Sequence, residues 1–64
     1  MKFKLSIELT NTAFVDFMNS ETARILKDLA NHIHGAVDLN VGMEGPLYDW
    51  NGNKVGIWIV EENK

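Results

Sequence analysis

The stretch LYDWNGNKVGIWIV, residues Leu47–Val60, decides the fold. Its Asn51-Gly52 dipeptide lies between two apolar runs, which is the strongest short-range signal for a β-hairpin. The run after the turn, residues 55–60, is apolar on both faces, as expected for a strand with a neighbour on each side. We therefore expect this strand to lie in the centre of a sheet, between an N-terminal strand and the strand that leads into the turn.

The length of the hairpin loop determines which side chains share a face of the sheet, because a shift of one residue moves every side chain to the other face. With a two-residue loop, Tyr48 faces Val55. With an additional glycine bulge, Leu47 pairs with Ile57 instead. We favour the bulge, because it places Leu47 inside the core and lets Asp49 accept hydrogen bonds from turn amides.

Three further segments complete the expected domain. Residues 2–10 alternate between polar and apolar side chains, which predicts a strand with one buried and one solvated face. Residues 20–34 have the periodicity of an amphipathic helix, with Ser20 as its N-cap and Gly35 ending it. Residues 37–43 also alternate, but the glycines and the proline near them are equally typical of a long loop, so an extra edge strand and a loop both stay open there.

The fold class that follows is α+β, a single small domain over residues 1–64 with the order β-α-β-β and one helix packed on a three-stranded, mostly antiparallel sheet. A chain of this size buries only about 60% of the surface that it exposes when unfolded, and small domains usually add a disulfide, a metal or a partner. The sequence has no cysteine, which excludes disulfides and thiolate metal sites. A well-packed core or self-association therefore remains as the source of stability.

Composition narrows the classes of partner. The net charge is −3, and the nine acidic residues are spread along the chain without forming a block. The six basic residues make no patch beyond Lys2 and Lys4, so we expect no nucleic-acid binding. No apolar run approaches the roughly 20 residues of a membrane span, and the N-terminus lacks a signal-peptide core. We therefore expect a cytoplasmic protein without a membrane partner.

Two sets of polar residues could act as ligands, and both have a simpler structural explanation. His32 and His34 would lie roughly 160° apart on a helix, too far for a shared metal, and both suit the negative end of the helix dipole. The spacing of the first calcium-loop ligands is present in Asp49, Asn51 and Asn53. Lys54 and Val60 stand where such a loop needs Gly and Glu, so we expect turn chemistry instead. With no catalytic constellation in the sequence, we predict no enzyme activity, no metal site and no cofactor.

The feature with most promise for function is a set of large apolar side chains. One helix covers only one face of a three-stranded sheet, and the favoured register places aromatic side chains on the opposite face, where an apolar patch would mark an interface. Tyr and Trp are also over-represented among binding hot spots. The residues expected to bind a partner or to form a dimer interface are Tyr48, Trp50, Trp58, Val60, Phe17 and Met18. The alternative is that these side chains wrap a small core.

Two motifs resemble those of a group of very small phage and prophage proteins. The motifs are ARILKDLANHI (Ala23–Ile33) and LYDWNGNKVGIW (Leu47–Trp58). Proteins of this group combine an N-terminal strand, an ARIL-x-x-LA helix and an L-x-D-x-NGN-x-VG hairpin. The resemblance implies a phage setting, in which small accessory proteins often bind and block host machinery, and it assigns no site residues.

We therefore expect a non-enzymatic accessory protein of the host bacterial cytoplasm that binds a host protein stoichiometrically, with a component of a host defence system as the candidate target. The alternative is a homodimeric structural protein, in which the sheet faces of two copies pack together and no foreign partner is inhibited.

Overall fold

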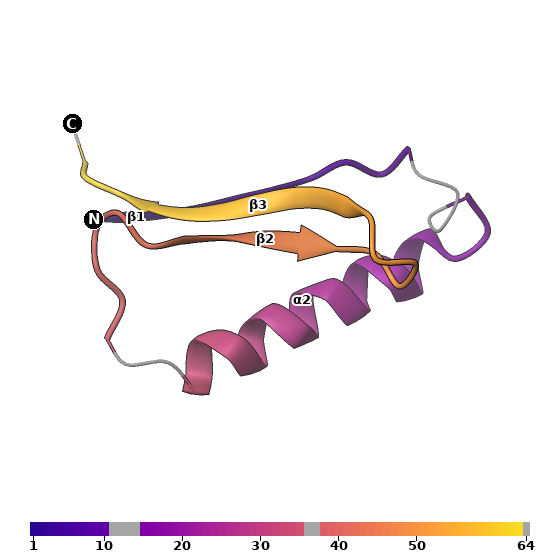
Figure 1. Cartoon of the computed structure of the whole chain (residues 1–64), viewed down its shortest axis with the longest axis horizontal. Coiled ribbons are helices and arrows are strands. Elements are labelled where there is room, and N and C mark those ends of the chain that lie inside the picture. Colours follow the sequence, from indigo (N-terminus) through magenta and orange to yellow (C-terminus); the bar gives the residue numbers. More distant parts are fainter. Residues whose placement is uncertain (11–14, 36–37, 64) are drawn as a thin grey trace.

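A computed structural model of the chain describes residues 1–10, 15–35 and 38–63 (Figure 1). Its elements are β1 (Lys2–Ile7), α2 (Met18–Gly35), β2 (Glu44–Tyr48) and β3 (Lys54–Glu61). The strands form an antiparallel sheet in the order β1-β3-β2, and α2 lies across one face of it, nearest to β2 (Figure 1). The expected β-α-β-β order, the single helix on a three-stranded sheet and the central position of the last strand are confirmed.

The helix begins earlier than the sequence predicts. It starts at Met18, so Ser20 lies inside the first turn and is not the N-cap. The Ser20 hydroxyl donates a hydrogen bond back to the Phe17 carbonyl oxygen at 3.3 Å, which is an alternative partner for a serine that does not cap a helix. The helix ends at Gly35, as expected, and both histidines lie in its last turn.

The connection between α2 and β2 is a loop wherever the structure describes it. Residues 38–43 form no strand, and Gly42 adopts a positive φ of 95° in the turn that precedes β2. The first residue of the candidate extra strand, Val37, lies outside the described residues. Two hydrogen bonds of 2.9 Å, from the Gly42 N–H to the Val60 carbonyl and from the Val60 N–H to the Met43 carbonyl, fasten the loop to β3.

The register of the hairpin differs from the favoured one. The pairs nearest the turn are Leu47 with Gly56 and Tyr48 with Lys54. The expected pairing of Leu47 with Ile57 is therefore wrong by one residue. A bulge is present, but it lies at Val55 in the returning strand rather than in the loop. Leu47 is buried, as expected.

The register decides which face of β3 packs against the helix. Trp58 is only 4% exposed and Val60 is also buried, because both side chains face α2. The expected placement of these two residues on the open face is therefore wrong. Ile57 takes that place and is exposed. The physical reason is that β3 is apolar on both sides, and packing the face that carries the tryptophan buries more apolar area. The core residues are Ile25, Leu29, Leu47, Val55, Trp58 and Val60.

Two glycines make room for this core. A Cβ at Gly45 would lie 2.5 Å from Nε1 of Trp58, so the indole ring occupies the space that a side chain would need. The Phe3 ring stacks on the same indole at a centroid distance of 5.6 Å and an interplanar angle of 7°. A Cβ at Gly56 would collide with the carbonyl oxygen of Ser6 in β1. The central strand thus approaches β1 closely at a point where only glycine fits.

Candidate functional site: an exposed aromatic surface

Four of the six residues predicted to bind a partner are exposed. They are Phe17 (63% exposed), Met18, Tyr48 and Trp50 (67% exposed). The other two, Trp58 and Val60, belong to the core and face the helix. The first four residues are thus accessible to a partner, whereas Trp58 and Val60 are not.

Phe17 and Trp50 lie together although they are far apart in the sequence. Phe17 directly precedes α2, and Trp50 lies in the hairpin turn. Their side chains line one shallow pocket, together with Ser20, Glu21 and Arg24. Met18 lines a second pocket with Phe17. Tyr48 lies apart from them and lines the two grooves that flank β2. We refer to Phe17, Met18 and Trp50 as the aromatic surface.

A buried carboxylate fixes the hairpin turn to the helix beneath this surface. Glu21 is buried in the first part of α2, and its carboxylate accepts hydrogen bonds from Nε of Arg24 at 2.5 Å and from the backbone N–H of Trp50 at 2.8 Å. The hydrogen bond from Arg24 lowers the pKa of Glu21, burial raises it, and the Trp50 N–H lowers it further; the net shift is downward. Glu21 is therefore a carboxylate at neutral pH.

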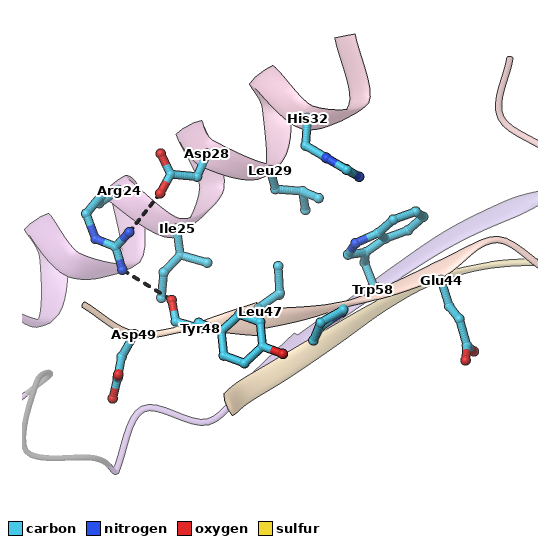
Figure 2. Close-up of a pocket in the computed structure, with 12 residues that line it drawn as sticks. Arg24, Ile25, Asp28, Leu29, His32, Glu44, Leu47, Tyr48, Asp49 and Trp58 are labelled. Carbon is cyan, nitrogen blue, oxygen red and sulfur yellow. Dashed lines mark hydrogen bonds and ion pairs between the residues drawn. The ribbon is translucent and has the colours of Figure 1, made fainter. Parts of the chain in front are cut away.

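Arg24 extends this link to β2. Its Nη2 donates to the Tyr48 carbonyl oxygen at 3.2 Å and its Nη1 to Asp28 at 2.7 Å, as the dashed lines in Figure 2 show. Arg24 and Asp28 have the i, i+4 spacing of an ion pair on one face of a helix. The hydrogen bond with Glu21 raises the pKa of Arg24, so the guanidinium stays charged and connects helix, strand and turn.

The turn itself is ordered by Asp49. This buried carboxylate accepts hydrogen bonds from the N–H groups of Asn51 at 3.0 Å and Asn53 at 2.8 Å, and Gly52 adopts a positive φ of 86°. Asp49 thus serves as the acceptor for the turn amides, as the sequence predicts. Of the three residues with the calcium-like spacing, Asp49 supplies its carboxylate oxygens to the turn, and Asn51 and Asn53 supply N–H donors. Trp50 is consequently held between two carboxylate networks.

Grooves lie on both sides of α2. The groove toward β2 has a volume of about 480 Å³ and contains Arg24, Asp28, His32 and the edge of Trp58 (Figure 2). The groove toward β1, of about 590 Å³, is apolar apart from His34. The two histidines therefore lie on opposite sides of the helix, as their spacing predicts. Within residues 1–10, 15–35 and 38–63, no group of three or more His, Asp or Glu side chains could hold a metal ion.

None of the helical residues that the structure describes forms a segment long and apolar enough to cross a membrane. Comparison of the chain with protein-family models, with curated proteins and with solved structures finds no match. The phage setting therefore stays a prediction from the two motifs, and the function has to be argued from the geometry.

Two features of the site were missed by the sequence reasoning. The link between Glu21 and Trp50 joins residues 29 positions apart, and no local pattern predicts it. The groove toward β1 did leave a signal, because the alternation of residues 2–10 places Phe3 and Leu5 on one face of the strand.

Proposed function

We propose that this protein is a non-enzymatic phage or prophage accessory protein that acts by binding a host protein stoichiometrically through the aromatic surface. The observation that carries the proposal is the exposure of Phe17 and Trp50, both more than 60% accessible and lining one pocket. Large exposed aromatic side chains that gather in one place are typical of protein interfaces and of their hot spots.

The backbone that carries the aromatic surface is held by hydrogen bonds, and this order favours binding. Binding costs free energy whenever it immobilises flexible segments, so a surface that is already ordered binds more tightly. The backbone of Trp50 is held by Glu21, and the turn around it is held by Asp49. The Phe17 carbonyl accepts the N–H of Glu21 at 2.8 Å, which joins this aromatic residue to the same part of α2.

The phage setting rests on the resemblance of the ARIL-x-x-LA helix and the L-x-D-x-NGN-x-VG hairpin. In that setting, a component of a host defence system is the candidate target, and occupation of one of its surfaces is the candidate mechanism. The proposal requires no chemistry by the protein itself.

The test compares the protein with the Phe17→Ala/Trp50→Ala double variant and with the Val41→Ala variant as a matched control, because Val41 is exposed far from the aromatic surface in the loop before β2. Each tagged protein is incubated with bacterial host lysate. A captured host protein is then purified and titrated calorimetrically against all three. We expect one-to-one binding by the protein and the control, and a loss of about 100-fold in affinity for the double variant.

An unchanged affinity of the double variant would show that the aromatic surface is not the binding site. If this protein itself turned over a substrate in the presence of the purified host protein, it would have a catalytic role, which the proposal excludes.

A further inference from the structure

The inner face of the sheet is closed by the helix on the β2 side but stays open on the β1 side. Phe3 and Leu5 point from β1 into the space between sheet and helix, yet they are 42% and 39% exposed. Leu26 of α2 faces the same groove and is 43% exposed. Ala30 and Ile33 complete the helical wall. We call this apolar cleft the β1 groove.

The surface area of the chain agrees with an incompletely covered core. The accessible surface is 4705 Å². A monomeric protein of 7.2 kDa typically exposes about 4,100 Å². The excess, about 600 Å², approaches the roughly 800 Å² per partner that a stable interface buries.

The outer edge of β1 is also available for pairing. The Glu8 N–H donates to the Val55 carbonyl oxygen at 2.7 Å, so Glu8 directs its backbone groups toward β3. Because these groups alternate along an antiparallel strand, Phe3, Leu5 and Ile7 direct theirs toward the outer edge. No described strand lies on that side of β1. Unpaired edges of this kind are templates for another strand.

We propose that a second copy of the chain occupies this edge and covers the β1 groove. Two copies pair through β1 in antiparallel fashion around a two-fold axis perpendicular to the sheet, with Leu5 opposite Leu5 of the second copy. Both helices then lie on the same side of a six-stranded sheet. The Phe3 and Leu5 side chains of both copies meet between the two helices, and about six backbone hydrogen bonds join the strands.

Several antiparallel registers of the two β1 strands would leave both helices on the same side of the sheet. The charged side chains favour the register with Leu5 at the two-fold axis. A pairing centred on Lys4 would set Lys4 opposite its own copy, and like charges directly opposite are unfavourable. A pairing centred on Leu5 sets Lys2 opposite Glu8 of the second copy, twice per dimer, and Lys4 opposite Ser6. A pairing centred on Ser6 would need the strand to continue well beyond Ile7, where β1 ends.

The lysines on β1 are also a common device against edge-to-edge association. In this chain their effect is offset, because Lys4 already pairs with Glu61 at 3.2 Å within one copy. Lys2 lies opposite Glu61 in the pairing of β1 with β3 and, on its other side, meets Glu8 of the second copy. The outer edge of β1 therefore favours pairing with β1 of a second copy, in the antiparallel direction and in the register centred on Leu5.

The inference goes beyond the proposed function and does not depend on it, since the aromatic surface lies at the other end of the helix from His34 and the β1 groove. A dimer would present two aromatic surfaces. Loss of host-protein binding and loss of self-association can thus be measured separately.

The experiment reverses the charge at two exposed positions, and circular dichroism first establishes that each variant is folded, because Lys2→Glu sets a carboxylate opposite Glu61. Sedimentation equilibrium at low ionic strength is run on the protein, on Lys2→Glu, on Glu8→Lys and on an equimolar mixture of the two variants. We expect each variant alone to self-associate about tenfold more weakly, because two attractive pairs become repulsive. The mixture should regain dimers, since the variant chains are complementary to each other.

The register is tested by cross-linking, because the chain has no native cysteine. Under mild oxidation, Leu5→Cys should form a covalent dimer in preference to Lys4→Cys and Ser6→Cys, since only the residue at the centre meets its own copy. A wild-type monomer up to about 100 µM, a mixture that stays monomeric, or preferential cross-linking at Lys4 or Ser6 would each overturn the proposal.

Discussion

Replacement of Trp58 by alanine tests most directly which face of the sheet carries the core. Trp58 is 4% exposed and contacts the Phe3 ring, the backbone of Gly45 and the His32 side chain at a centroid distance of 6.3 Å. Trp50, the other tryptophan, is 67% exposed. The two substitutions should therefore have very different effects on stability.

The magnitude follows from the buried area. Burial of a tryptophan removes about 200 Å² from water, which at about 25 cal/mol per Å² corresponds to about 5 kcal/mol. This is an upper bound, because the unfolded chain is itself partly compact. Large-to-small substitutions in cores cost about 3–5 kcal/mol, and a domain of this length has a total stability of about 3–10 kcal/mol. Trp58→Ala should therefore remove most of the stability of the fold.

The assay is urea denaturation followed by circular dichroism. Trp50→Ala should change the free energy of unfolding by less than about 0.5 kcal/mol, whereas Trp58→Ala should lack a folded baseline. Trp58→Phe provides a measurable intermediate, with an expected loss of roughly 2 kcal/mol because the smaller ring retains part of the buried area. The same variants isolate each fluorophore, since Trp50→Ala leaves only Trp58.

Tryptophan fluorescence tests the same prediction for variants that are too unfolded for a denaturation curve to be fitted. In Trp50→Ala, the remaining Trp58 should emit at short wavelength and resist quenching by acrylamide. In Trp58→Phe, the remaining Trp50 should emit at long wavelength and be quenched readily. The opposite pattern, or a larger loss of stability for Trp50→Ala than for Trp58→Phe, would mean that the helix covers the other face of the sheet.

Three further perturbations test the local geometry. Gly56→Ala should destabilise the fold by about 3 kcal/mol, because its Cβ would collide with the Ser6 carbonyl, and denaturation would measure this. Asp49→Ala should cost about 2 kcal/mol by removing the acceptor for two turn amides, visible as a lower urea midpoint. Acid should lower the melting temperature: because the pKa of Glu21 lies below its ordinary value of 4.5 in the folded chain, its contribution is full above that value and is lost as the pH falls through the lowered pKa.

Each of these predictions has a matched control. Gly35→Ala, where no atom lies within 4 Å of the new Cβ, should leave stability nearly unchanged, and an equal loss at both glycines would contradict the steric argument. Asn51→Ala retains the Asp49 acceptor and should cost less than Asp49→Ala. Glu21→Gln should flatten the acid limb of the melting profile; an unchanged limb would assign the pH dependence to other groups.

The candidate site was only partly predictable. Exposure of Trp50 and the role of Asp49 in the turn follow from the Asn51-Gly52 signal, because turn residues lie at the surface and use nearby acceptors. The proximity of Phe17 to Trp50 did not follow, since it depends on how the helix is positioned relative to the hairpin. The buried Glu21 that fixes this position reads in the sequence only as a favourable charge in the first helical turn.

The sequence by itself determined the elements of this protein and their order in the sheet. Polar–apolar alternation, helical periodicity and the hairpin turn are local signals, and the two-sided apolar strand at residues 55–60 requires a central place. Only the tertiary structure decided which face of that strand is buried. The bulge at Val55 sets the register, and the face that is buried depends on packing Trp58 against Phe3, Gly45 and the helix. Those contacts come from segments distant in sequence, so their energies are absent from any local pattern.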